Sequence, residues 1–590
     1  MPSHDPHSHA DLTQARIRHL DLHIEVDFAA NRLRIVAEYL LDRPATGPLD
    51  LDSRDLDIAS IEAGGRRIEF EMGEPEVVLG QRVRLLDLGG ADRFTLSVTT
   101  SPHASALQWL EAHHTASGRH PFVYSQCQPL HARSLFPCQD TPSVRFTYAA
   151  RLTVPKGLTA AMAAACTGRE AHRDLEVFRF EMPQAIPSYL FALAVGDLAF
   201  RQLGPRTGVY AEPPLLEAAA WEFAENESRL AAAEALFGPY AWDRYDLLVM
   251  PPSFPSNGME NPRLTFVTPL AILGDRSRMA LIAHELAHAW TGNLVTNATW
   301  DDFWLNEGWT TYADHRITEA LEGPEVAGLL QAVLLDVLRE DIRAFGPDSP
   351  HTCLKTSLAG IDPDAVFSRV PYMKGQLFLL SLEQAVGRLR FDAFLREYIR
   401  RFRFQSLTTE DFLAFLEREL PEAAQAVDVQ AWVYRPGLPE RLPAMRSALY
   451  DEVVRRRRDF EAGALPSSAE AAAWHPYQRI LFLRLLPPTI SIDDCGRIEA
   501  SLGLRTTKRT LELYEFLRLA TRSGYAQVWP MMEAFAERVG NEYQLKRVFR
   551  SLAEAEWSRP LTRPLFERVR HRHHPITEGL VDQLLRELGV

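Results

Sequence analysis

The sequence predicts a multidomain α+β protein. We expect an N-terminal antiparallel β domain (1–207), a central α/β domain (208–438) and a C-terminal all-α helical domain (439–590). The chain of 590 residues is too long for one ordinary hydrophobic core. Apolar residues alternate with polar ones over the first two hundred residues, whereas they recur at helical spacing beyond residue 439. Clusters of proline and glycine at 204–205 and 435–443 separate the three regions.

Period-two patterns predict the N-terminal strands. Every second residue is apolar in 22–28 and again in 33–39, and a short turn at 29–31 joins these runs. The longer run 144–154 repeats the same period. Strands of this kind bury one face of each sheet, which is typical of antiparallel β structure.

The central and C-terminal regions combine other patterns. Residues 216–236 and 279–290 are predicted as helices, and 246–250 as a buried strand. Beyond the second linker, apolar residues at 545, 548, 549 and 552 occupy one helical face. Glycines at 503, 524 and 540 break this region into segments, so we expect stacked helical hairpins.

The composition excludes several classes of function. The net charge is −14 and no long basic stretch dominates, so no nucleic-acid partner is expected. No run of about 18 apolar residues occurs, so no membrane span is expected. The first twenty residues contain no apolar stretch, so no signal peptide is expected. Five scattered cysteines without a CxxC pair favour a reducing, cytoplasmic location. The histidines at 4, 7, 9, 571, 573 and 574 are expected in solvated tails.

The central chemical signal is the run HELAH, from His284 to His288, in a predicted helix. Residues four apart project from one helix face, so these two imidazoles can share one metal ion. Glu285 follows the first histidine, where it can take a proton from a metal-activated water without binding the metal. A helix with two incidental histidines is the alternative, because short motifs also occur by chance.

A third candidate ligand strengthens the metal interpretation. Glu307 follows His288 by nineteen positions and opens a second apolar helix. Two histidines and one glutamate leave a fourth position for water, which is the arrangement of a catalytic zinc site. Asp314 lies seven residues further on the same helix face, where it could orient a ligand histidine. An ordinary solvent-exposed acid is an equal alternative for Asp314.

Longer motifs carry a resemblance to a known family. GMEN at 258–261, HELAH, NEG at 306–308 and VPYMKG at 370–375 occur in this order. In them the chain resembles the gluzincin zinc aminopeptidases, most closely the branch of leukotriene A(4) hydrolase and aminopeptidase B. Further matching stretches run from the β domain to the last quarter of the chain: QCQ at 126–128, PCQDTPS at 137–143, PPSF before GMENP and LTFVTP after it, the segment around HELAH as far as NEG, IDPD at 361–364, and TRPLF at 562–566.

The resemblance implies a thermolysin-like zinc catalytic domain that removes N-terminal residues from peptides with a free N-terminus. It implies one Zn²⁺ per chain, held by His284, His288 and Glu307, with Glu285 as general base and then general acid. Tyr372 would donate a hydrogen bond to the oxyanion. The implied substrate contacts are Glu260 for the free α-amino group, Gly258 for close backbone approach, Met259 beside it, Gln126 and Gln128 near the first side chain, and Asp364 at the bottom of that pocket, where it could favour a basic residue.

The chain departs from the family pattern at three places. Ser256 and Asn257 stand before GMEN, where this branch usually has an aromatic residue and a second glycine. Phe367 stands where the lipid hydrolases carry a tyrosine. The basic pair that grips a substrate carboxylate is not matched cleanly, and Arg559 and Arg563 are the nearby candidates; a structural role for either is an equal alternative.

Three rival functions remain at the level of sequence. An epoxide hydrolase acting on a fatty-acid epoxide could use the same zinc site. A binding scaffold that has kept the fold without its activity is a second alternative, and an endopeptidase is a third. The sequence makes no prediction about the oligomeric state or the preferred N-terminal residue.

Overall fold

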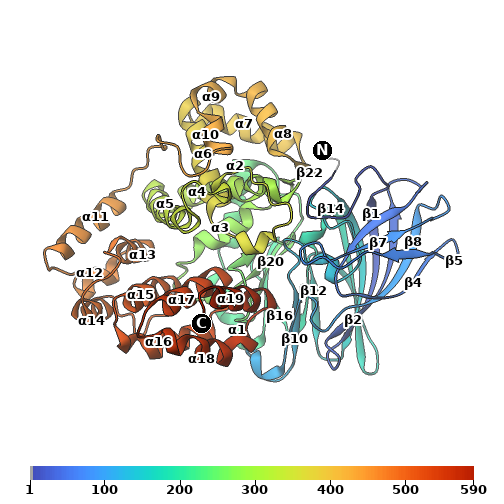
Figure 1. The fold of residues 1–590 in the computed structure, drawn as a ribbon, viewed down its shortest axis with the longest axis horizontal. Helices are drawn as coiled ribbons and strands as arrows, with labels where there is room; N and C mark the ends of the chain where they lie inside the picture. Colours follow the sequence, from blue (N-terminus) through green and yellow to red (C-terminus); the bar gives the residue numbers. More distant parts are fainter. Residues whose placement is uncertain (1–3) are drawn as a thin grey trace.

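The computed structural model describes residues 4–590 and consists of three parts. Strands from the first third of the chain form one side of the molecule, a mixed helical and stranded part lies in the middle, and helices from the last quarter cover the opposite side (Figure 1). The predicted order of a β-rich domain, a mixed domain and a helical domain is therefore confirmed.

The N-terminal part contains an eight-stranded, a four-stranded and a three-stranded sheet. The eight-stranded sheet runs β13 (Ala165–Ala171), β14 (Leu175–Pro187), β11 (Arg145–Pro155), β1 (Ile17–Asp27), β2 (Arg32–Leu41), β8 (Arg93–Thr99), β4 (Asp57–Ala63) and β5 (Arg66–Arg67). The smaller sheets run β12 (Thr159–Met162), β15 (Leu193–Gly196), β10 (Phe122–Ser125), β9 (Leu107–Leu110), and β3 (Leu49–Ser53), β7 (Gln81–Leu85), β6 (Phe70–Met72).

Alternation along the strands produces the buried face of the large sheet. Leu20, Leu22 and Ile24 of β1 are buried, whereas the residues between them are exposed. β1 pairs with β2 in an antiparallel manner but with β11 in a parallel manner, so the sheet is mixed and not purely antiparallel as predicted. A period of two reports which face a residue occupies and carries no information about the direction of a distant neighbour.

The central part is built on a five-stranded sheet in the order β16 (Ala199–Gln202), β17 (Thr207–Ala211), β18 (Tyr245–Val249), β20 (Leu264–Val267) and β19 (Gly258–Met259). The predicted boundary at 207 falls inside the β16–β17 hairpin of this sheet. We therefore propose that the central domain begins near residue 199. β19 lies at the edge of the sheet, so one side of its backbone is free to pair with another chain.

Helices α1 (Pro213–Glu222) and α2 (Asn226–Phe237) occupy the segment predicted as one helix. They are followed by α3 (Met279–Ala287), α4 (Trp304–Glu322), α5 (Pro324–Phe345), α6 (Val370–Val386), α7 (Arg388–Arg401), α8 (Thr409–Glu419), α9 (Pro421–Ala426) and α10 (Val429–Val433), with the short strands β21 (Val295–Asn297) and β22 (Gln405–Leu407). α4 and α6 cross at Gly308 and Gly375, where a Cβ atom on Gly308 would lie 2.8 Å from the Cα of Gly375. Only two glycines allow the helices to approach this closely.

The C-terminal helices form a second hydrophobic core. They are α11 (Ala448–Glu461), α12 (Ser468–Ala473), α13 (Pro476–Leu485), α14 (Ile492–Ser501), α15 (Thr510–Arg522), α16 (Trp529–Arg538), α17 (Glu542–Glu554), α18 (Arg559–Val569) and α19 (Pro575–Glu587). Leu329 and Val333 of α5 belong to this core, so α5 joins the central domain to the helical one. Among residues 4–590, no helix is long and apolar enough to cross a membrane.

The prediction of solvated histidine tails holds for His4 and His571, which are exposed, but is wrong for His7 and His574, which are buried. The side chain of His7 is fully buried, and its Nε2 lies 3.0 Å from the carbonyl oxygen of Leu358 and 3.1 Å from that of Ile361. His574 is also fully buried and caps α19. The polar sequence around these histidines predicted that they are exposed. This prediction failed where a segment distant in the sequence covers them, because local polarity carries no information about such a segment.

Candidate active site

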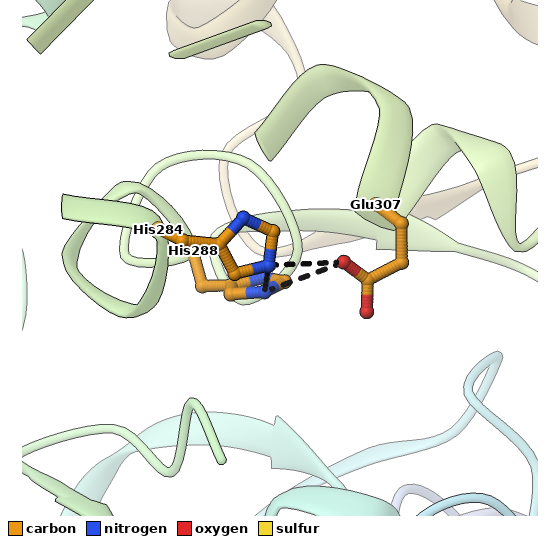
Figure 2. Close-up of side chains that lie close together, drawn as sticks. All are labelled: His284, His288 and Glu307. Atoms are coloured by element: carbon orange, nitrogen blue, oxygen red, sulfur yellow. Dashed lines mark hydrogen bonds and ion pairs between the residues drawn. The ribbon is translucent and has the colours of Figure 1, made fainter. Parts of the chain in front are cut away.

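Two helices bring the three predicted metal ligands together (Figure 2). His284 lies in the last turn of α3, His288 is the C-cap residue of this helix, and Glu307 projects from the first turn of α4. The two Nε2 atoms lie 3.2 Å apart. The Oε2 atom of Glu307 lies 3.3 Å from Nε2 of His284 and 3.6 Å from Nε2 of His288. Three donor atoms therefore converge on one point.

The donors fit a zinc ion chemically. Glu307 is buried, and within the described chain its Oε2 makes no hydrogen bond although two imidazole nitrogens face it. Burial raises the pKa of Glu285 to about 8, and the charge of Glu307 adds to this rise. Buried carboxylates that oppose one another's ionisation are relieved by a nearby cation. Two imidazoles and one carboxylate form a ligand set that zinc uses in catalytic sites.

Second contacts orient the two histidines. The Nδ1 atom of His284 lies 2.8 Å from Oδ2 of Asp314, which belongs to the same helix as Glu307. The Nδ1 atom of His288 lies 3.2 Å from the hydroxyl of Thr310. Each contact occupies the ring nitrogen that points away from the convergence point and so leaves Nε2 for a metal.

The backbone of β19 lies directly against Glu285. A Cβ atom on Gly258 would collide with the Glu285 carboxylate, so any side chain here would displace that group. Glu260 directly follows this short strand and is 4% exposed. The amide of Gln128 donates to Oε1 of Glu260 over 3.2 Å, and Asn293 donates to its backbone carbonyl over 2.7 Å. Burial raises the pKa of Glu260 well above its ordinary value, and the charges of Glu307 and Glu285 raise it further.

Tyr372 reaches the site from the first turn of α6. Burial raises the pKa of Tyr372 well above its ordinary value, and the nearby charge of Glu307 raises it further. The guanidinium of Arg369 lies 4.7 Å from the centre of the Tyr372 ring, and the ring of Phe367 lies 6.0 Å from it. The close crossing of α4 and α6 therefore sets the tyrosine beside the metal ligands.

These residues line one cavity of about 340 Å³, whose wall combines residues of all three domains. Gln126, Gln128, Gly258, Glu260 and Asp364 all contribute to its wall. The Oδ2 atom of Asp364 lies 2.9 Å from Nε2 of His131. Met259 does not line the cavity; it is buried behind the wall, where its sulfur accepts a hydrogen bond from the amide of Gln126 over 3.1 Å.

Arg559 and Arg563 do not reach the cavity. Arg559 donates to the carbonyl oxygens of Leu588 and Gly589, and Arg563 donates to that of Val590. Both arginines on α18 therefore bind the C-terminal end of the chain. This is the structural role that the sequence analysis gave as the alternative to substrate binding. The structure does not support their expected grip on a substrate carboxylate, because sequence proximity to TRPLF does not specify the direction in which α18 faces.

Sequence reasoning missed the segment that the helical domain contributes to the cavity. Asn541, Glu542 and Tyr543 at the start of α17 line the wall. Gly540 allows this approach, since a side chain there would collide with the backbone at 252–253. The available signal was the pair Gly540-Asn541, because asparagine is a preferred N-cap and here accepts from the amide of Gln544.

Comparison with known proteins shows the family of the chain. The model of the peptidase family M1 domain matches residues 221–433, that of the peptidase M1 N-terminal domain matches 19–190, and that of the leukotriene A4 hydrolase C-terminal domain matches 474–585. The leukotriene A-4 hydrolase of Xenopus laevis is 37% identical over 600 residues, covering 98% of each chain. The chain belongs to peptidase family M1. This M1 chain is also 34% identical to leucine aminopeptidase 2 of Pyricularia oryzae, covering 100% of this chain and 99% of that one.

Solved structures extend the likeness to the fold. Yeast LTA4 hydrolase in complex with bestatin has a TM-score of 0.90 at 30% identity, covering 99% of this chain and 98% of that chain. An M1 zinc metallopeptidase from Deinococcus radiodurans has a TM-score of 0.58 at 25% identity, covering 73% of this chain and 97% of that chain. Membership of family M1 confirms the predicted class of enzyme, a zinc-dependent aminopeptidase.

Proposed function

We propose that the chain binds one zinc ion through His284, His288 and Glu307 and uses it to release the N-terminal residue of peptides. The observation that carries this proposal is the position of Glu260. Glu260 directly follows the edge strand β19 and lines the same cavity as the three converging donors. A carboxylate there can pair with a free α-amino group and fix the distance from the peptide end to the metal.

The edge strand supplies a track for the substrate. An extended peptide can pair with the free side of β19, as peptides do with other exposed sheet edges. With its amine at Glu260, the peptide runs past Gly258, where the Glu285 carboxylate lies. The chain is thus held so that its first peptide bond reaches Glu285.

The residues around this bond divide the chemistry. A bound zinc ion would polarise the scissile carbonyl and make the attacking water more acidic. Glu285 accepts the proton of that water and passes it to the departing amine. Tyr372 donates a hydrogen bond to the oxygen on which negative charge develops. The side-chain amide of Gln128 donates a hydrogen bond of 3.2 Å to the Glu260 carboxylate and so orients it for the substrate amine.

Hydrolysis of a fatty-acid epoxide in the same site is the second candidate. Four apolar residues of α5 line the cavity, and an acyl chain could lie along them: Leu330, Val333, Leu334 and Val337. The comparisons include both leukotriene A-4 hydrolase and leucine aminopeptidases, and they do not favour the epoxide reaction over the peptidase. Phe367 offers no hydroxyl for such a reaction, so we place it second.

A panel of aminoacyl anilides, each also prepared with an acetylated amine, tests the proposed function. We expect hydrolysis of the free forms, loss of hydrolysis after treatment with a chelator, and recovery with one equivalent of Zn²⁺ per chain. Hydrolysis of the acetylated forms at the same rate as the free forms would show that the enzyme does not recognise the free α-amino group. The predicted cytoplasmic location remains a prediction.

A further inference from the structure

The cavity wall contains three arginines in different environments. Arg484 forms ion pairs with three carboxylates: Asp336, Glu340 and Glu515. The guanidinium of Arg369 lies over three aromatic rings: Phe367, Tyr372 and Tyr543. Among residues 4–590, Arg278 has neither kind of partner, and its side chain contacts only the Asn257 amide oxygen through a hydrogen bond. One cation of the cavity is therefore left without compensation.

The environment of Arg278 is unfavourable for a positive charge. The residue is only 8% exposed, and its Nε atom has no hydrogen-bond partner in the described chain. Its one hydrogen bond is long, 3.4 Å from Nη2 to Oδ1 of Asn257. Burial lowers the pKa of Arg278 accordingly. It also stands at the N-cap of α3, where the helix dipole repels a cation.

The same features that disfavour a lone cation favour a bound anion. Ala280, in the first turn of α3, lines the cavity beside Arg278, so the positive end of this helix faces the cavity. A guanidinium presents a planar pair of donors that matches a carboxylate. A carboxylate bound here would satisfy the free Nε atom and neutralise the buried charge.

We propose that Arg278 receives a carboxylate of the peptide substrate on the leaving-group side of the scissile bond. This inference rests on the proposed function and names a substrate preference within it. It makes the enzyme selective for peptides that carry a carboxylate shortly after their first residue.

The order of residues 257–260, which include β19, places Arg278 on that side. Glu260 holds the amine, and Gly258 marks the scissile bond because it touches Glu285. Asn257 comes next, and Arg278 is bonded to its side chain. Extended chains advance about 3.3 Å per residue, so Asn257 lies opposite the second or third residue of the substrate.

Two further acids of the cavity, Asp364 and Glu542, lie near each other. Asp364 is paired with His131, and burial and the charge of Asp364 together raise the pKa of Glu542 to about 8. No ion pair links either acid to Arg278 in the described part of the chain. The cavity thus has a separate acidic region, and the guanidinium of Arg278 stays available.

Two sources could supply the carboxylate: the C-terminus of a short peptide or an acidic side chain. Four peptides distinguish them: Leu-Ala-Ala, Leu-Ala-Ala-amide, Leu-Glu-Ala-amide and Leu-Ala-Glu-amide. We expect kcat/KM of at least one carboxylate-bearing peptide to exceed that of Leu-Ala-Ala-amide by about tenfold or more, as for hydrogen bonds to charged groups. Preference for the free acid alone identifies the C-terminus, and preference for a glutamate peptide identifies the side chain.

The substitution Arg278→Gln assigns the preference. We expect the ratio of kcat/KM between the preferred peptide and Leu-Ala-Ala-amide to fall to about one, and Arg278→Lys to retain part of it. Arg509→Gln is the matched control, because Arg509 is already paired with Asp275 over 2.7 Å. The ratio compares two substrates on one preparation, so reduced folding does not change it.

An equal kcat/KM for all four peptides on the wild-type enzyme would overturn the proposal, as would an unchanged ratio in Arg278→Gln. Leucine anilide separates these failures from failure of the proposed function, because it has no residue after the scissile bond. If the wild-type enzyme hydrolyses the anilide but shows no preference for any carboxylate-bearing peptide, only the proposed role of Arg278 is wrong. If it does not hydrolyse the anilide or any peptide, the proposed function is lost as well.

Discussion

His284 and Asp314 are joined by a hydrogen bond of 2.8 Å between Nδ1 and Oδ2. The pair links α3 to α4. His284 lies about one helical turn before the ligand His288, and Asp314 lies about two turns after the ligand Glu307. Asp314 thereby fixes the ring so that Nε2 faces Glu307. Orientation of a ligand imidazole by a carboxylate increases metal affinity.

The substitution Asp314→Asn should therefore weaken zinc binding by about 10–100-fold. Competition with a chelator of known affinity measures the change directly. Glu322→Gln is the matched control, since Glu322 is an exposed acid near the end of the same helix. Equal zinc affinity in the Asp314 variant and the control would remove Asp314 from this role.

The hydroxyl of Tyr372 should contribute to turnover more than to binding. Tyr372→Phe removes the donor that faces the developing oxyanion, and loss of one such donor lowers kcat by about 10²–10³-fold. Steady-state kinetics with an aminoacyl anilide, together with the zinc content of each preparation, provide the measurement. An unchanged kcat at normal zinc content would assign the oxyanion to another group.

The contact between Gly308 and Gly375 should be intolerant of any side chain. Gly308→Ala would place a Cβ 2.8 Å from the Cα of Gly375 and force α4 and α6 apart. Overpacking of this kind costs about 1–3 kcal/mol of unfolding free energy. Denaturant unfolding measures this cost, and turnover should fall too because Tyr372 moves with α6. Gly579→Ala is the control, since a Cβ on Gly579 of α19 meets no atom within 4 Å.

Lys374 should make the stability of the protein depend on pH. Its ammonium is fully buried and donates to the carbonyl oxygens of Thr352 and Arg435, and burial lowers its pKa to about 8. Between this value and the ordinary lysine pKa of about 10.4, the unfolded chain binds more protons than the folded one. Stability contributed by this residue therefore rises as the pH rises through this range.

The difference in unfolding free energy between the wild type and Lys374→Met reports this contribution. We expect it to increase in favour of the wild type by about 2–3 kcal/mol from pH 7.5 to pH 10.5. Lys508→Met, at an exposed position, is the matched control. A difference that stays constant with pH would mean that Lys374 keeps its proton throughout.

Sequence patterns predicted the elements near the metal ligands because helical spacing and short motifs are local properties. The spacing of His284 and His288 requires only one helix, and the start of α4 follows from a short apolar run. The parallel pairing of β1 with β11 was missed because it joins segments over a hundred residues apart. For the same reason the sequence could not decide between a cavity role and a structural role for Arg559, and it did not indicate that Arg278 lines the cavity.

The approach of the two domains explains the remaining difference. The start of α17 enters the cavity only because Gly540 packs against the backbone at 252–253. That contact depends on how the central and helical domains pack together, and neither composition nor periodicity specifies this packing. His7 was misjudged in the same way, because the surface that buries it is formed by residues 358–361.

The central claim is that Glu260 binds the substrate amine and so limits hydrolysis to the first peptide bond. The most direct test is the ratio of kcat/KM for Leu-Ala-Ala to that for acetyl-Leu-Ala-Ala, measured on wild-type enzyme and on Glu260→Ala at equal zinc content. We expect the wild type to favour the free amine by about 10–100-fold or more, as for a charged hydrogen-bonded pair, and the variant to lose most of this preference. An equal preference in both proteins would contradict the account.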